Sequence, residues 1–117
     1  MVKAAILVLA GTESAADLGR ITNALQTAKE FDKHDDEYVV LFDGAATQWV
    51  AELEDEEHKL HALYRSVKDE ISVCDFCVGA YEQDDPVDAS GIERSDEYEG
   101  HPSIRSLAAD GYEVITF

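Results

Sequence analysis

The stretch Val2–Ala10 (VKAAILVLA) is an almost continuous apolar run that contains one lysine. Such a run is typical of a central strand buried on both faces of a parallel sheet. Gly11–Glu13 interrupts it, and Ser14 is placed to cap a helix predicted over Ala15–Phe31, where apolar residues recur at helical spacing. The chain therefore begins as an α/β protein does, with a strand, a turn and a helix.

The alternation continues to the end of the chain. Four more strands are predicted, at Glu37–Phe42, Ile71–Val78, Ile92–Tyr98 and Tyr112–Phe117. The intervening helices are predicted around Trp49, over His58–Asp69, from Pro86 to Gly91, and from Pro102 as first helical residue to Gly111 at the C-terminal end. We expect a single α/β domain over residues 1–117, a doubly wound, mainly parallel five-stranded sheet with helices on both faces.

The charge balance is strongly acidic. The chain has 26 Asp and Glu against 9 Lys and Arg, for a formal net charge of −17. Because the acidic residues are spread over the whole sequence, we interpret them as a salt-adapted, halophilic surface; the alternative is an acidic patch for a basic partner. Binding of nucleic acid is not expected, since phosphate contacts need Lys and Arg.

Segments that would direct the chain to a membrane are not apparent. No apolar run approaches the length of about 18 residues that a membrane helix needs. The N-terminus lacks the architecture of a signal peptide, so we expect a cytoplasmic protein without membrane association. Two cysteines in such a chain do not form a disulfide scaffold, and they are core residues, metal ligands or a reactive pair.

The two cysteines form a CxxC motif, Cys74-Asp75-Phe76-Cys77. In redox proteins of the thioredoxin kind this motif opens a helix, whose dipole favours the thiolate. Here the preceding residues are strand-like and no helical pattern begins at Cys77. If a strand ran through both thiols they would face opposite sides of the sheet, so they can meet only if the strand ends near Cys74.

A metal site is a weaker hypothesis. His58 and His61 precede the cysteines in an H-x2-H-x12-C-x2-C pattern, and four such ligands would suit zinc. Both histidines flank the apolar face of a predicted helix, which places them at the edge of a solvated surface. We therefore predict no metal, and the absence of Gly-rich phosphate motifs predicts no nucleotide cofactor.

Ligands of doubly wound sheets bind beyond the carboxyl ends of the strands. The connections at that edge include Thr12, Asp43 and the segment after Cys77. His101 also lies there and is a candidate acid/base group or thiolate partner, with helix capping as the alternative. Thr12, Asp43 and His101 are therefore candidate site-lining residues.

The combination of fragments resembles the DsrE/DsrF-like proteins over nearly the whole chain. The resemblance lies in Leu9-Ala10-Gly11-Thr12, Phe42-Asp43-Gly44, Cys74-x-x-Cys77-x-Gly79-Ala80, Glu99-Gly100-His101-Pro102-Ser103-Ile104 and Tyr112–Phe117. It implies a flavodoxin-like α/β fold and assembly as a homo-oligomer, a trimer or a hexamer. It also implies sulfur relay between donor and acceptor proteins, with Cys74 at the position of the persulfide-carrying cysteine.

Three functions follow from these observations. The first is a sulfur carrier in which Cys74 is the nucleophile and Cys77 assists, which would be persulfide transfer rather than classical enzymatic turnover. The second is a thiol-disulfide redox protein, and the third is a non-catalytic oligomeric module that binds an unknown ligand. We expect Cys74 to be the more reactive thiol, although the neighbouring Asp75 would raise its pKa.

Overall fold

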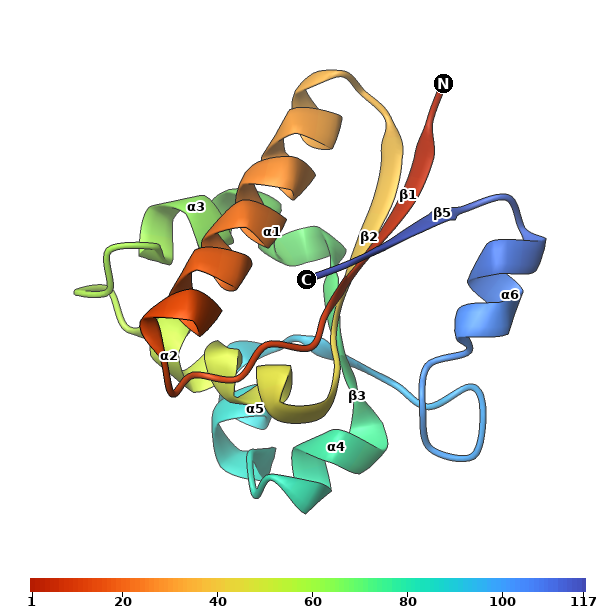
Figure 1. The fold of residues 1–117 in the computed structure, drawn as a ribbon. Helices are drawn as coiled ribbons and strands as arrows, with labels where there is room; N and C mark the ends of the chain where they lie inside the picture. Colours follow the sequence, from red (N-terminus) through yellow and green to blue (C-terminus); the bar gives the residue numbers. More distant parts are fainter.

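A computed structural model describes residues 1–117, in which five strands alternate with helices (Figure 1). The strands are β1 (Lys3–Val8), β2 (Glu37–Phe42), β3 (Ile71–Cys74), β4 (Glu93–Ser95) and β5 (Glu113–Thr116). The α-helices are α1 (Ala15–Lys33), α2 (Trp49–Glu54), α3 (His61–Val67), α4 (Asp75–Ala80), α5 (Asp84–Ser90) and α6 (Ile104–Ala109). Two 3-10 helices, η1 (Gly44–Gln48) and η2 (Lys68–Glu70), complete the chain.

The five strands form one sheet in the order β4-β3-β2-β1-β5, and every pair is parallel. The predicted five-stranded parallel α/β fold is confirmed. Helix α1 packs on one side of the sheet and α6 lies on the other (Figure 1). None of the helices is both long enough and apolar enough to span a membrane.

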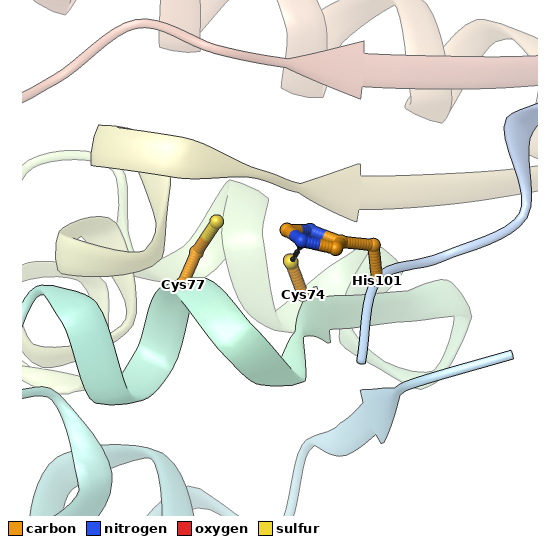
Figure 2. Close-up of side chains that lie close together, drawn as sticks. All are labelled: Cys74, Cys77 and His101. Atoms are coloured by element: carbon orange, nitrogen blue, oxygen red, sulfur yellow. Dashed lines mark hydrogen bonds between the residues drawn. The ribbon is translucent and has the colours of Figure 1, made fainter. Parts of the chain in front are cut away.

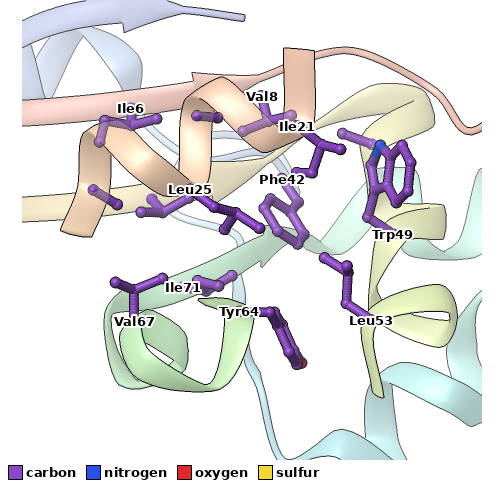
Figure 3. Close-up of a cluster of buried hydrophobic side chains, with 14 of the residues drawn as sticks. Ile6, Val8, Ile21, Leu25, Phe42, Trp49, Leu53, Tyr64, Val67 and Ile71 are labelled. Carbon is purple, nitrogen blue, oxygen red and sulfur yellow. The ribbon is translucent and has the colours of Figure 1, made fainter. Parts of the chain in front are cut away.

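The main hydrophobic core lies between the sheet and helices α1, α2 and α3 (Figure 3). Alternate residues of each central strand face it, as the two-residue period of a strand requires. Ile6, Val40 and Phe42 are fully buried there, and Trp49 anchors η1–α2 by donating from Nε1 to the carbonyl of Ala10 at 2.9 Å. Trp49, predicted to be core or interface, is a core residue.

The opposite face of the sheet is covered more thinly. Its side chains Ala5, Leu7 and Leu41 are buried, yet α6 contains no buried residue at all. Because β2 and β3 pair Phe42 with Val73 on the core side, the next residues, Asp43 and Cys74, belong to this second face. The carboxylate of Asp43 and the thiol of Cys74 therefore lie together at the carboxyl edge of the second face.

The third strand is shorter than predicted. It ends at Cys74, and α4 carries Asp75 through Ala80, so the expectation of a strand to Val78 and of no helix at Cys77 was wrong. The β3–β4 ladder ends where Cys74 pairs with Ser95. Asp75 occupies the first turn of α4, where the helix dipole favours a carboxylate.

The last helix also begins later than predicted. Ser103 is its N-cap and accepts a hydrogen bond from the Ser106 N–H, so Pro102 precedes the helix instead of opening it. The predicted glycine end is confirmed, because Gly111 follows the helix with a φ of +91°. Pro102 thereby closes the loop that carries His101, and this loop reaches the cysteines.

Candidate functional site

Three side chains converge at the carboxyl end of β3 (Figure 2). Cys74 is the last residue of the strand, Cys77 lies in the first turns of α4, and His101 enters from the loop before α6. The Cys74 Sγ lies 3.3 Å from His101 Nδ1, and all three ligand atoms lie within 4.8 Å of one another. The end of the strand at Cys74 lets both thiols of the CxxC motif point to the same place.

Asp43 joins this cluster from the end of β2. The Cys77 thiol donates to its Oδ1 at 3.4 Å, and the same oxygen accepts from the Gly44 N–H at 2.8 Å, which caps η1. The strand alternation places Asp43 beside Cys74 on the second face, as described above. Asp43, Cys74, Cys77 and His101 are named here the thiol cluster.

The loop that carries His101 is a tight hairpin. Tyr98 and His101 exchange both backbone hydrogen bonds, at 2.8 and 2.9 Å. The two residues between them have positive φ, +51° for Glu99 and +88° for Gly100, as a type I′ turn requires. A non-glycine residue at positive φ is uncommon and costs conformational energy, which the surrounding contacts must offset.

The hairpin is docked directly on α4. The Phe76 N–H donates to the Gly100 carbonyl at 2.9 Å, and the Phe76 ring stacks on His101 with ring centroids 4.8 Å apart. These two contacts fix the imidazole over Cys74. Phe76 itself is 59% exposed, so this aromatic contact lies at the protein surface.

A carboxylate holds the base of the hairpin. Glu97 accepts from the Ser95 hydroxyl at 2.7 Å, and also from the backbone N–H groups of Asp96 and Ser103. The hydrogen bond from Ser95 is the largest influence on Glu97 and lowers the pKa of its carboxyl below the ordinary value, against the opposing effect of burial. Glu97 therefore stays ionised at neutral pH and keeps both ends of the loop together.

Asp75, inside the CxxC motif, is neutralised by Arg94. The Arg94 guanidinium contacts Asp75 at 3.2 Å, and it also binds Asp84 and Asp88 of α5 at 3.2 and 2.9 Å. The arginine thus ties β4, α4 and α5 together. This pairing offsets the charge of Asp75, and burial, rather than Asp75, is the largest cause of the raised pKa of Cys74.

Burial makes Cys74 a weak acid. Its side chain is fully buried, and this desolvation raises the pKa of the Cys74 thiol from 9.0 to about 12. The negative charge of Asp43 also raises the pKa, whereas a hydrogen bond from the Cys77 N–H lowers it. Cys77 is only partly buried. Cys74, predicted from the sequence to be the more reactive thiol, is therefore the more deeply buried of the two and depends on His101 for activation.

Other candidate residues lie elsewhere. Thr12 lines a separate shallow pocket with Trp49 and His58, so it does not belong to the thiol cluster. His61 Nδ1 contacts the Leu53 carbonyl at 2.7 Å, and His58 Nδ1 accepts from the Leu60 N–H at 3.0 Å. The H-x2-H part of the possible zinc pattern thus serves local packing, apart from the cysteines.

The fold and the thiol cluster together define a parallel α/β protein with a Cys-Cys-His site at the sheet edge. No protein-family model matches the sequence. The chain is 26% identical over 93 residues, 80% of its length and 76% of the relative's, to an uncharacterized protein of Methanocaldococcus jannaschii. A solved structure of a conserved protein of unknown function from Bacteroides thetaiotaomicron matches 97% of this chain and 94% of its own, with a TM-score of 0.65 and 13% identity, which supports the fold.

The two thiols should differ in their reaction with a neutral alkylating reagent such as iodoacetamide. We expect Cys77 to be labelled at least about tenfold faster than Cys74 at pH 7, because Cys74 is fully buried whereas Cys77 is partly exposed to the reagent. Cys74→Ser and Cys77→Ser report on each thiol separately by intact mass. Denatured protein is the control, in which both should react alike; equal rates in the folded protein would contradict the prediction.

Proposed function

We propose that this protein is a two-thiol sulfur carrier, in which Cys74 receives and hands on a sulfur atom and Cys77 acts as the resolving thiol. The observation that supports it best is the 3.3 Å contact between Cys74 Sγ and His101 Nδ1 with the Cys77 thiol alongside. A nucleophile, a base and a second thiol at one point are the parts that such chemistry needs. The resemblance of the sequence to DsrE/DsrF-like proteins agrees with this function.

The transfer step uses His101 to make the nucleophile. The imidazole takes the proton of the buried Cys74 thiol, which offsets the effect of burial on that thiol. The Cys74 thiolate attacks the outer sulfur of a donor persulfide, so a new S–S bond forms on Cys74 while the donor S–S bond breaks and the donor leaves as a thiolate. No external oxidant is required.

The release step uses Cys77. An acceptor thiolate can take the outer sulfur and regenerate the Cys74 thiolate. Alternatively, Cys77 attacks the Cys74 sulfur of the persulfide, which forms a Cys74–Cys77 disulfide and expels hydrosulfide. The persulfide is the oxidant in this second route, because its outer sulfur is reduced as the two cysteines are oxidised.

A sulfur carrier needs partner proteins and a reducing location. We propose that sulfur donor and acceptor proteins approach beside Phe76 and the partly buried Cys77, and that the hairpin over Cys74 moves to let their sulfur reach that thiol. A homo-oligomer, trimer or hexamer, would cover the thin second face of the sheet. A cytoplasmic location suits free thiols, which stay reduced there.

The experiment is intact-mass analysis of reduced protein after incubation with a polysulfide donor. We expect wild type to gain one sulfur, about 32 Da, and Cys74→Ser to gain none. Cys77→Ser should retain the adduct and prolong its lifetime, because the resolving thiol has gone. A gain that persists in Cys74→Ser would contradict the assigned role of Cys74.

A thiol-disulfide redox function is the second candidate, because the two thiols lie close enough for a disulfide to form after a small movement. The same experiment separates the two functions. A redox protein would lose two hydrogens on treatment with an oxidant and would show no trapped persulfide in Cys77→Ser. Absence of both products would favour the third possibility, a binding module with structural cysteines.

A further inference from the structure

We propose that Cys74, Cys77 and His101 form a binding site for one thiophilic divalent cation of the zinc class, with the fourth position open on the side of Asp43. Two sulfurs and an imidazole nitrogen are ligands that Zn²⁺ prefers. They come from three different places in the chain, the end of β3, α4 and the hairpin. The site does not rest on the proposed sulfur chemistry, because it requires only the positions of these three side chains.

The distances fit a tetrahedral site after small movements. Zn–S bonds of about 2.3 Å and Zn–N bonds of about 2.0–2.1 Å place neighbouring ligand atoms about 3.5–3.8 Å apart. The Cys74 Sγ to His101 Nδ1 distance is 3.3 Å, and the cluster as a whole spans at most 4.8 Å between any two of the three atoms. A shift of about 1 Å in the side chains therefore brings these three atoms to the separations of zinc ligands.

Asp43 is a neighbour of this ligand set. Its Oδ1 accepts from the Cys77 thiol at 3.4 Å and from the Gly44 N–H at 2.8 Å, so the carboxylate is oriented beside one of the ligands. Binding exchanges the two thiol protons for the cation and leaves all oxidation states unchanged. The cation also offsets the charges of the two thiolates in a chain of net charge −17.

This set differs from the one suggested by sequence spacing. His58 and His61 bind backbone groups of their own segment, whereas His101, from 24 residues after the CxxC motif, points at both thiols (Figure 2). Since the cation would occupy the atoms that carry sulfur, metal binding and persulfide formation exclude each other. Zinc would therefore protect or silence the thiols, and its removal would make them available.

Cobalt titration tests the site directly. Reduced, metal-free protein is titrated with Co²⁺, followed by absorption, and the Co²⁺ is then displaced with Zn²⁺. We expect near-ultraviolet thiolate-to-cobalt charge-transfer bands and visible bands of four-coordinate intensity that saturate at one equivalent. Folded wild-type protein that develops no thiolate-to-cobalt bands at excess Co²⁺ would overturn the proposal.

Variants identify the ligands. His101→Gln should weaken the affinity by more than about tenfold, because even an outer-shell partner of a metal ligand contributes about 10- to 100-fold. Cys77→Ser should reduce the charge-transfer absorption, and His34→Gln, a histidine on the exposed end of α1, is the matched control that should bind as wild type does. Circular dichroism confirms that each variant is folded. Unchanged affinity in folded His101→Gln, or loss of binding in His34→Gln, would contradict the assigned ligand set.

Discussion

Phe42→Ala is expected to lower the free energy of unfolding by about 3–5 kcal/mol, the usual cost of truncating a buried phenylalanine. Phe42 has no exposed surface and lies at the centre of the core, between the sheet and helices α1 and α2 (Figure 3). The cavity left by the smaller side chain cannot collapse easily, because β1 and β3 hold β2 in place from both sides. Since domains are stable by about 5–15 kcal/mol in total, this one change removes a large part of the stability.

The matched control is Phe76→Ala, which truncates the same residue type at a position that is 59% exposed. It should cost far less, about 1 kcal/mol or below, in line with surface substitutions. Urea denaturation of both variants in concentrated KCl, analysed by linear extrapolation, measures the difference. Similar losses in the two variants would show that Phe42 does not occupy a rigid core.

Long apolar patterns made much of the fold predictable. β2 has the bounds predicted from EYVVLF, and α1 begins at the predicted cap, where Ser14 accepts from the Asp17 N–H at 3.1 Å. The third strand was misjudged because Val73, Cys74 and Val78 are apolar whether the segment is strand or helix, and so short a run does not distinguish the two. The strand ends where its pairing with β4 ends, and this pairing depends on the tertiary structure rather than on the local sequence.

The candidate site was predictable only in part. The CxxC motif pointed to the two cysteines. The strand-end argument named Asp43 and His101, which lie beside the cysteines, and Thr12, which lines another pocket. The hairpin contacts that place His101 join residues far apart in sequence, so no local pattern indicates them. The role of Arg94 was missed for the same reason. An arginine in so acidic a chain nevertheless favours a cluster of carboxylates around its guanidinium, as is found here.

The protein is expected to lose stability on the order of a few kcal/mol, or about 10 °C in melting temperature, when KCl is lowered from about 1 M to about 0.1 M. Only seven of the 26 acidic residues form ion pairs. The radius of gyration is 13.2 Å, so with a Debye length of about 10 Å at 0.1 M each carboxylate is repelled by the many others on its own side of the molecule. At about 1 M the Debye length is about 3 Å and the repulsion acts only between neighbours.

One acidic cluster provides a local test of this repulsion. At the amino end of β2, around Tyr38, a shallow cavity is lined by Asp32, Asp35, Asp36, Glu37 and Glu70. Asp35 is exposed and has a φ of +56°, a conformation that asparagine also adopts readily, so Asp35→Asn removes one charge without straining the turn. The variant should melt at a higher temperature than wild type in about 0.1 M KCl.

The difference between the two proteins should vanish in about 1 M KCl, where their charges are screened. This convergence separates electrostatic repulsion from a general strengthening of hydrophobic burial by salt, which would raise both melting curves equally. Thermal melts followed by circular dichroism at several KCl concentrations measure it. Two curves that stay parallel over the whole range, or a wild-type melting temperature that does not move with salt, would show that charge repulsion does not limit the stability of this fold.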